Sequence, residues 1–451
     1  MSTIKKAKKI HFIGVGGIGV STLAQIFNEQ GKKITGSDAE DSDHIKQMQK
    51  AGIKISIGHT AKNVTPTHNL VIHSYAIEHD NPELEKARKL KIPTMTYPEA
   101  VGELSKDYYT ISITGTHGKS TTTAMMSLLA LKSGLDPTII LGTKLKELGN
   151  KNYRIGKSNL LLVEACEFRN AFLNYKTNVL AILNIDSDHL DFFKTQGNYI
   201  KAFNKACKRV PKSGLIILDA DDKFSEEIEE GAKAEVVKIT RNAKLKEEHH
   251  HLKHHKLKIG KKSLTIKPRV PGSFNVLNAA FAAVIGEHLK ISNRKIETGI
   301  AAFKGCWRRM ELKKTKLKGT DFYDDYAHLP AEIDVTLQAM RETHPKAKIL
   351  AVFQPHQFIR IKNYLKEFGM AFSGADHVLI PDILRNRDTE EQMELIGTQE
   401  LIDEIKKYKK RNVFHSTDIP DTAKWIKKNH KKYDIIIAMG SGDVKKLYKY
   451  L

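Results

Sequence analysis

Short apolar runs followed by amphipathic, helix-like segments recur along the whole chain, and this alternation predicts an α/β protein. Four clear runs are KKIHFIG, YYTISITG, NLLLVE and NVLAILNID, each ending in glycine or an acidic residue. Continuous apolar runs of this kind are typical of strands buried on both faces of a parallel sheet. The carboxyl ends of such strands share one edge of the sheet, where α/β proteins bind ligands.

The alternation falls into three blocks, which we take as three domains. We place them at residues 1–107, 108–306 and 307–451, and expect a mainly parallel sheet flanked by helices in each. The first and third blocks fit Rossmann-like domains, and the middle block fits a P-loop ATPase domain. Residues 242–270 differ, because they are basic, rich in histidine and alternating; they predict a small antiparallel ribbon at the edge of the middle block.

Composition places the chain among globular proteins. Of its 451 residues, 40% are hydrophobic and 28% are charged, and no apolar run approaches the ~18 residues that a membrane-spanning helix needs. The basic N-terminus runs directly into a strand-like segment, so we expect neither a signal peptide nor a membrane partner. The three cysteines, Cys166, Cys207 and Cys306, are far apart, which favours a reducing cytoplasm.

The formal net charge of +22 raises the question of a nucleic-acid partner. The lysines are spread through all three blocks, however. The densest run, KKYKKR at residues 406–411, holds one aromatic residue and no RNA-recognition signature. We therefore do not expect a nucleic-acid partner, and interpret the charge either as a basic surface that attracts anionic substrates or as the composition of a lysine-rich proteome.

The first of two glycine-rich turns lies near the N-terminus. Gly14, Gly16 and Gly19 form a G-x-G-x-x-G pattern between a strand and a helix, and Asp38 comes at the end of the next strand. Bare backbone amides at such a turn, together with the helix N-terminus, bind a diphosphate. The pattern predicts a nucleotide diphosphate ligand, of which NAD is one alternative.

The second turn is GTHGKS, residues 115–120. It departs from the standard P-loop, because Ile113 stands where that template has its first glycine. Its two glycines still allow tight turns, Lys119 would reach phosphates, and Ser120 or Thr121 would offer a hydroxyl to Mg²⁺. Between a strand and an apolar helix, the turn predicts an ATP site; a threonine-rich helix start is the alternative.

A metal-assisted ATP site needs ligands on neighbouring strands. Glu164 ends the run NLLLVE, and His189 follows the run NVLAILNID. Carboxylate and imidazole are both ligands for Mg²⁺ or Mn²⁺, although imidazole is less usual for Mg²⁺. The five histidines within residues 249–255 lack a cysteine partner for zinc, and in a lysine-rich ribbon they fit a solvated tract.

Polar side chains also gather in the third block. Arg308 and Arg309 stand where the middle block meets the third, and would clamp a phosphate or a carboxylate; an interdomain salt bridge is the alternative. The other candidates lie at the carboxyl ends of two predicted strands and would converge at a crevice there. They are Asp324, Asp325, Tyr326, His328, His356 and Arg360.

Taken together, these landmarks resemble one known family. HFIGVGGIG, TGSD, ITGTHGKSTTT, VEACE, NIDSDHLD, PGSFNVLNA, RRMEL, DDYAHLPAE, FQPH and MGSGD resemble, in order and over essentially the whole chain, the motifs of the Mur ligases. The resemblance implies a UDP-sugar domain, a central ATP domain whose loop has the short GTHGKS form, and a third domain that brings an amino acid. FQPH favours the member that uses UDP-N-acetylmuramate and L-alanine over the murein tripeptide ligase.

The resemblance also implies a role for each matching residue. The UDP-sugar side would comprise Gly14, Gly16, Gly17, Ile18, Gly19, Ser37, Asp38 and Ser74. The ATP side would comprise Gly115, Thr116, His117, Gly118, Lys119, Ser120, Thr121, Asn275, Asn278 and Arg309. The metal ligands would be Ser120, Glu164 and His189, and the amino-acid side would comprise Tyr326, His328, His356 and Arg360. The catalytic set would be Lys119, Glu164, His189, Arg309 and His328.

The implied reaction is ATP-dependent, ADP-forming amide-bond formation in peptidoglycan precursor synthesis, by a cytoplasmic monomer or homodimer. Four positions depart from the family pattern: Cys166 for Asp, Phe274 for His, Leu329 for His and Gln357 for Arg. Gln357 leaves the acceptor open, with glycine or serine as alternatives to L-alanine. An NAD-linked oxidoreductase and a nucleotide-binding regulator without catalysis are the other hypotheses.

Overall fold

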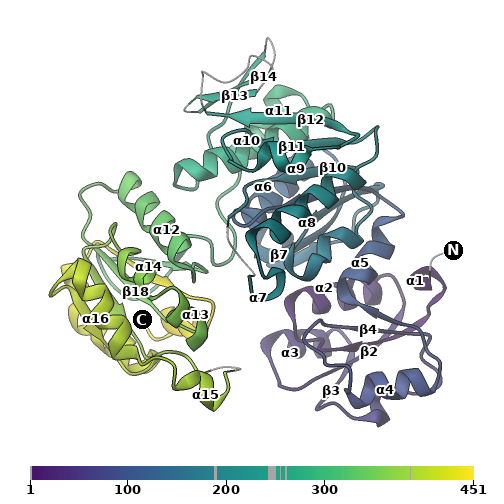
Figure 1. Ribbon diagram of the computed structural model, residues 1–451, viewed down its shortest axis with the longest axis horizontal. Coiled ribbons are helices and arrows are strands. Elements are labelled where there is room, and N and C mark those ends of the chain that lie inside the picture. The colour runs from purple at the N-terminus through teal and green to yellow at the C-terminus, as the bar shows by residue number, and fades with distance from the viewer. Residues whose placement is uncertain (1–2, 187–189, 242–249, 254, 260–261, 386–387) are drawn as a thin grey trace. The chain divides into compact units, whose positions relative to one another are not determined.

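The computed structural model describes residues 3–186, 190–241, 250–253, 255–259, 262–385 and 388–451 (Figure 1). Its contacts divide the chain into two compact units, one of residues 1–267 with 277–302 and the other of residues 268–276 with 303–451. Three sheets flanked by helices confirm the predicted three-domain α/β class. The residue numbers of the domain boundaries stay predictions.

The first sheet has five parallel strands in the order β3-β2-β1-β4-β5. They are β1 (Lys9–Ile13), β2 (Lys33–Asp38), β3 (Lys54–Ile57), β4 (Leu70–His73) and β5 (Thr94–Thr96). The helices are α1 (Thr3–Lys6), α2 (Ile18–Glu29), α3 (Asp43–Lys50), α4 (Pro82–Lys89) and α5 (Tyr97–Ser105). Because the chain continues from β1 to either side of the sheet, the carboxyl end of β1 lies at a topological switch point.

The second sheet has ten strands in the order β15-β14-β13-β12-β11-β10-β6-β9-β7-β8. They are β6 (Tyr109–Thr114), β7 (Thr138–Leu145), β8 (Lys151–Arg154), β9 (Leu160–Glu164), β10 (Val179–Ile182), β11 (Leu215–Asp219), β12 (Glu235–Thr240), β13 (His250–Lys253), β14 (Lys256–Ile259) and β15 (Lys262–Thr265). Its helices include α6 (Lys119–Lys132), α7 (Leu190–Phe193), α8 (Gln196–Arg209), α9 (Ser225–Glu229), α10 (Ser273–His288) and α11 (Asn293–Ala301). Strands β13 to β15 form the predicted antiparallel ribbon at the sheet edge, and β13 itself runs parallel to β12.

The third sheet has six strands in the order β16-β17-β21-β18-β19-β20, with only β16 antiparallel to its neighbour. They are β16 (Glu311–Lys313), β17 (Asp321–Asp325), β18 (Ile349–Phe353), β19 (His377–Ile380), β20 (Val413–His415) and β21 (Ile435–Met439). Its helices are α12 (Pro330–Thr343), α13 (Phe358–Asn363), α14 (Leu365–Met370), α15 (Glu390–Met393), α16 (Thr398–Lys409) and α17 (Ile419–Asn429). Separate apolar clusters cover its two faces, as a doubly wound sheet requires.

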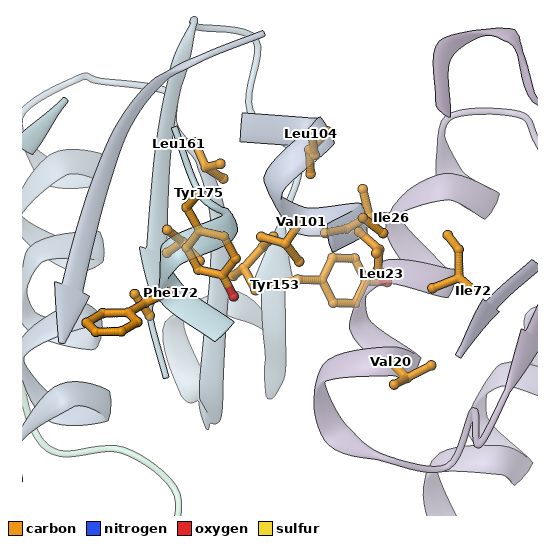
Figure 2. Packing of buried hydrophobic residues seen from close by; sticks show 14 of the residues in the cluster. Val20, Leu23, Ile26, Ile72, Val101, Leu104, Tyr153, Leu161, Phe172 and Tyr175 are labelled. Carbon is orange, nitrogen blue, oxygen red and sulfur yellow. The ribbon is translucent and has the colours of Figure 1, made fainter. Parts of the chain in front are cut away.

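One hydrophobic core joins the first and second sheets. Figure 2 shows Leu23 and Ile26 of α2 beside Tyr153 of β8, with Val101 of α5 and Tyr175 completing the cluster. The ring of Tyr153 is buried, and its hydroxyl donates to Glu29 at 2.7 Å. Within this unit, the two sheets are therefore parts of one packed body rather than loosely linked modules.

Across the part of the chain that the structure describes, none of the helices combines the length and the apolar character needed to cross a membrane.

Candidate active site

The first glycine turn follows β1 and is held by the end of β2. The amides of Gly14 and Val15 donate to the carbonyl of Ser37 at 2.9 and 3.0 Å, and the amide of Gly16 donates to Asp38 Oδ2 at 2.7 Å. A Cβ atom at Gly16 would lie 3.0 Å from the same carboxylate oxygen. The sequence pattern therefore folds into the predicted turn between a strand and a helix, and the side chain of Asp38 fixes this turn by accepting the backbone amide of Gly16.

The other candidates of this turn surround it, with one exception. Helix α2 begins at Ile18 after Gly17, Gly19 packs on the ring of Tyr97, and Ser74 lies against Gly14. The hydroxyl of Ser37 points into the interior instead, where it donates to Glu83 Oε2 at 2.6 Å. Ser37 thus supports the turn from beneath through its carbonyl and its buried side chain.

The second turn joins β6 to α6 and has no room for side chains at its glycines. Gly118 has φ +84°, and a Cβ atom there would lie 2.6 Å from Asn278 Oδ1. At Gly115, a Cβ atom would lie 3.0 Å from backbone atoms of Leu183 and Asn184. This crowding explains why the short GTHGKS form keeps these two glycines although Ile113 replaces the first glycine of the standard template.

Polar contacts from the end of β10 hold the two residues between the glycines. The amide of His117 donates to Asn184 Oδ1 at 2.8 Å, and Asn184 Nδ2 donates back to the His117 carbonyl at 3.1 Å. The Thr116 hydroxyl lies 3.0 Å from the hydroxyl of Tyr199, which is fully buried. The turn is therefore a fixed structure rather than a loose loop.

Lys119 is the positive charge of this turn. Its Nζ atom donates to the carbonyls of Gly115 at 2.5 Å and Thr116 at 3.0 Å, and lies 3.1 Å from Glu167 Oε1. Burial disfavours the ammonium, but the negative charge of Glu167, with a smaller contribution from Glu164, outweighs it and raises the pKa of Lys119. The side chain is therefore charged at neutral pH.

Ser120 and Glu164 meet beside the lysine. The Ser120 hydroxyl donates to Glu164 Oε1 at 2.7 Å, and the amide of Gly142 donates to Oε2 at 2.7 Å. Thr121 follows on α6 and is buried. His189, the third predicted metal ligand, lies outside the described residues. Among the described residues, no three His, Cys, Asp or Glu side chains come together as a metal-binding group.

The two asparagines of α10 differ in their surroundings. Asn278 lies against Gly118, so it borders the second turn. Asn275, in the first turn of α10, donates from Nδ2 to the carbonyl of Pro271 at 2.5 Å.

In the histidine tract, His250 begins β13 and His255 Nδ1 lies 3.1 Å from the Ile266 carbonyl; His249 and His254 lie outside the described residues.

In the third domain, four predicted side chains converge at the carboxyl ends of β17 and β18. The rings of Tyr326 and His328 lie 5.2 Å apart, and those of His328 and His356 lie 5.5 Å apart. Arg360 Nη1 donates to His356 Nε2 at 3.0 Å. Burial, aided by the charge of Arg360 and by that of His328 when it is protonated, lowers the pKa of His356 to about 3, so this imidazole is neutral and accepts the hydrogen bond.

The two arginines at the start of this domain differ in role. Arg308 is almost fully buried; its Nε donates to Asp324 Oδ1 at 3.2 Å, and its Nη1 donates to the Ser441 carbonyl at 3.3 Å. These contacts make Arg308 a structural residue within its own unit. The guanidinium of Arg309 lies 5.3 Å from the ring centre of Tyr326, next to the four converging side chains.

Three residues at the second turn were not predicted from the sequence: Asn184, Glu167 and Tyr199. The Tyr199 hydroxyl donates to Glu167 Oε1 at 3.3 Å, so both belong to the surroundings of Lys119. The motif VEACE contained one signal, a second acidic residue close behind Glu164. Cys166 between them is an exposed residue, yet desolvation of its thiol by the surrounding protein and the charge of Glu167 raise the pKa of Cys166 to about 12, so it is not a thiolate at neutral pH.

Comparisons with known proteins agree along the whole chain. Residues 9–109 match the Mur ligase family catalytic domain, residues 113–286 the Mur ligase middle domain, and residues 308–442 the Mur ligase glutamate ligase domain. The UDP-N-acetylmuramate–L-alanine ligase of Clostridium kluyveri is 38% identical, over 97% of this chain and 96% of its own length. The enzyme of that name from Caldanaerobacter subterraneus is 34% identical, over 98% and 96%.

Solved structures lead to the same family. The UDP-N-acetylmuramate–alanine ligase of Thermotoga maritima superposes with a TM-score of 0.81 at 26% identity, covering 98% of this chain and 97% of its own. A murein peptide ligase of Psychrobacter arcticus shares the fold, with a TM-score of 0.72 at 20% identity and coverage of 98% and 97%. The chain, with its two glycine turns and three sheets, belongs to the Mur ligase family.

Proposed function

We propose that this chain is an ATP-dependent, ADP-forming ligase that joins L-alanine to the lactyl carboxylate of UDP-N-acetylmuramate in peptidoglycan precursor synthesis. The observation that carries the proposal is the turn before α6, where Lys119, Ser120 and Glu164 gather at the ends of β6 and β9. The relatives that are 34% and 38% identical over nearly the whole chain bear the name of this activity. A cytoplasmic location and a monomer or homodimer stay predictions.

The triphosphate of ATP is proposed to bind at this turn. Backbone amides at the start of α6 and the ammonium of Lys119 are suited to the β- and γ-phosphates. Asn278 borders the same turn and is the candidate for the adenine side, together with Asn275. Because Lys119 is already charged and held by three acceptors, it would need to exchange some of them for phosphate oxygens.

A divalent cation fits the same place. Ser120 and Glu164 supply a hydroxyl and a carboxylate, the hard oxygen donors that Mg²⁺ and Mn²⁺ prefer. When bound, the cation would neutralise charge on the phosphates. His189 remains a predicted ligand.

The UDP part of UDP-N-acetylmuramate is proposed to lie at the first turn. The glycines there keep the backbone bare, and the N-terminus of α2 favours the diphosphate charge. Candidate contacts are Gly14, Gly16, Gly17, Ile18, Gly19, Asp38 and Ser74. This assignment replaces NAD as the ligand of the fingerprint.

The proposed chemistry proceeds through an acyl phosphate. The lactyl carboxylate oxygen attacks the γ-phosphorus of ATP and ADP leaves; the amine of L-alanine then attacks the acyl carbon, and phosphate leaves. Lys119 would steady the phosphates, and Arg309 is our candidate for the transferred phosphoryl group. The protein supplies mainly charge and orientation, so catalysis depends on holding the reactants in line.

His328 is our candidate for the base that takes the amine proton. Its Nδ1 atom lies 3.0 Å from Glu332 Oε2 and 3.1 Å from the Tyr326 carbonyl, and both partners are acceptors. Nδ1 therefore carries the hydrogen, which leaves the proton-accepting lone pair on Nε2. Arg360 is proposed to bind the carboxylate of the amino acid, since Gln357 stands where the family pattern has a further arginine.

The test is phosphate release with UDP-N-acetylmuramate, Mg-ATP and each of L-alanine, glycine and L-serine. We expect release that depends on the UDP-sugar and is fastest with L-alanine. Lys119→Ala should lower kcat by at least 100-fold, because it removes the turn's only ammonium. Lys132→Ala, an exposed lysine on the same helix, should leave kcat unchanged.

Two results would contradict the proposal. Phosphate release at the ATP-only rate with every acceptor would rule out the ligase activity and favour the hypothesis of a nucleotide-binding regulator without catalysis. Faster release with glycine or serine than with L-alanine would keep the ligase and change the acceptor.

A further inference from the structure

A buried carboxylate lies beneath the first glycine turn, and the proposed chemistry does not use it. It belongs to Glu83, which sits in the first turn of α4 and is fully buried. The Ser37 hydroxyl, Asn63 Nδ2, His11 Nε2 and the Thr60 amide lie 2.6, 2.6, 3.0 and 3.1 Å from its two oxygens. Four groups from three parts of the chain thus converge on one side chain.

A buried, ionised carboxylate destabilises the fold unless hydrogen bonds or an opposite charge stabilise it. Burial alone strongly disfavours the ionised form. The hydrogen bonds from His11, Ser37 and Asn63 outweigh that burial and lower the pKa of Glu83, so the side chain is ionised at neutral pH. Residues that are kept charged inside a domain commonly serve to hold other groups in place.

Two short paths connect Glu83 to the glycine turn. Through the first, Ser37 donates its hydroxyl to Glu83 while its carbonyl accepts the amides of Gly14 and Val15. Ser37 is thus clamped from both sides, and the clamp fixes the direction in which the first amides of the turn point.

The second path runs along the connection after β3. Asn63 Nδ2 donates both to Glu83 Oε1 and, at 3.2 Å, to the carbonyl of Gly58. The amide of Gly58 donates to the Asp38 carbonyl at 2.7 Å, and Asp38 receives the amide of Gly16. The first three amides of the turn, those of Gly14, Val15 and Gly16, are therefore linked through Ser37 and Asp38 to the same buried carboxylate.

We propose that Glu83 is a positioning residue that sets the affinity for the UDP-sugar by holding Ser37 and Asp38, and through them the amides of the Gly14–Gly19 turn. The inference rests on the proposed function, in which this turn binds the UDP part. A neutral amide is a poor substitute for the carboxylate, since it offers one oxygen and an NH₂ group that would face two donors.

The first experiment compares Glu83→Gln with Glu85→Gln, which removes an exposed carboxylate from the same helix. Calorimetry measures the Kd for UDP-N-acetylmuramate, and steady-state kinetics measures kcat and the KM for each substrate, all with the full chain. Glu83→Gln should raise the Kd and KM for the UDP-sugar about tenfold, the weight of one hydrogen bond. Its kcat and its KM for ATP should change less than twofold, and Glu85→Gln should behave as wild type.

The second experiment breaks only the link between the carboxylate and β2. Ser37→Ala keeps the other three partners of Glu83, so it decides the question should Glu83→Gln not fold. It should raise the Kd for the UDP-sugar as well. The double variant should raise the Kd for the UDP-sugar by less than the product of the two single-variant factors, because both changes break the same path.

The possible failures are distinguishable. A wild-type protein without measurable binding of UDP-N-acetylmuramate would overturn the proposed function and this inference with it. Wild-type binding together with an unchanged Kd in the folded Glu83→Gln and Ser37→Ala variants would overturn the inference alone. A parallel rise in the KM for ATP would also overturn it, because a general loss of structure would then explain the effect.

Discussion

At the scale of single residues, the ion pair between Lys119 and Glu167 joins the ammonium of the second turn to a buried carboxylate, with 3.1 Å between Nζ and Oε1. Glu167 is fully buried, and the lysine side chain is 16% exposed. Removing one partner of such a pair leaves the other charge uncompensated. We expect Glu167→Gln to lower the free energy of unfolding by about 1–3 kcal/mol, less than for a fully buried pair since two carbonyls still hold Lys119.

Urea unfolding measures this change. Glu147→Gln, which removes an exposed carboxylate from the same domain, is the matched control and should shift the unfolding free energy by less than about 0.5 kcal/mol. Equal stability of the two variants would mean that the pair contributes nothing to the fold.

His356 predicts a pH dependence of stability. Its pKa is about 3 in the folded chain and near 6.5 when exposed, so between these values the unfolded state binds more protons. The stabilisation from the neutral imidazole is complete above pH ~6.5 and is lost as the pH falls toward 3, at up to about 1.4 kcal/mol per pH unit. His356→Gln should therefore show a shallower loss of stability between pH 6 and 4.

Nuclear magnetic resonance gives the direct measurement. The imidazole signal that disappears in His356→Gln should stay in its neutral form down to pH 5 in the wild-type protein. Titration of that signal near pH 6.5 would refute the burial argument.

Sequence reasoning succeeded at single residues where the chemistry is local, and it missed the partners that come from far away. Lys119 was predicted from its turn, but Glu167, which is 48 positions away, became visible only when β9 was placed beside β6. Glu83 and His11 are 72 positions apart and lie on different elements. Glu83 has no local pattern that separates it from an exposed glutamate on a helix, and the only local signal for Glu167 is its place behind Glu164 in VEACE.

At the scale of elements, helix α6 has a glycine in the left-handed region at each end. Gly118 precedes the helix at φ +84° and a Cβ atom there would strike Asn278, whereas Gly134 follows it at φ +86° with no atom within 4 Å. Alanine at either position meets the same backbone penalty, about 1 kcal/mol. Only Gly118→Ala also distorts the turn, so we expect it to weaken ATP binding at least tenfold while Gly134→Ala leaves binding unchanged.

Calorimetric titration with ATP tests the pair of variants, with UDP-N-acetylmuramate as the second ligand in both. The UDP-sugar affinity should stay the same, because the first turn belongs to another sheet. Loss of ATP binding in Gly134→Ala would show that the helix itself, rather than the space at its start, governs the site.

The elements that the sequence predicted well are those whose signal is periodic or punctuated. Buried parallel strands with polar ends and glycine turns before helices were found where expected, and so was the edge ribbon. What the pattern could not supply was the partner of each apolar face. The stripe of Leu23 and Ile26 on α2 predicts a buried face, but only the structure shows that β8 of another sheet covers part of it.

At the scale of the whole molecule, this shared core leads to a prediction about cooperativity. Val20, Leu23, Ile26, Val101 and Leu104 of the first domain share one buried cluster with Tyr153 and Tyr175 of the second. Asn152 adds polar contacts, since its Nδ2 donates to the Ile18 carbonyl at 3.2 Å. Separating the two sheets would expose this apolar surface, so we expect residues 1–267 and 277–302 to unfold as one unit.

Differential scanning calorimetry with each ligand tests this cooperativity. A ligand raises the transition of the unit that binds it. If the first two sheets unfold together, ATP and UDP-N-acetylmuramate will each raise the same transition, although their proposed turns lie on different sheets. Two separate transitions, one raised only by ATP and one only by the UDP-sugar, would refute the shared core as a cooperative unit.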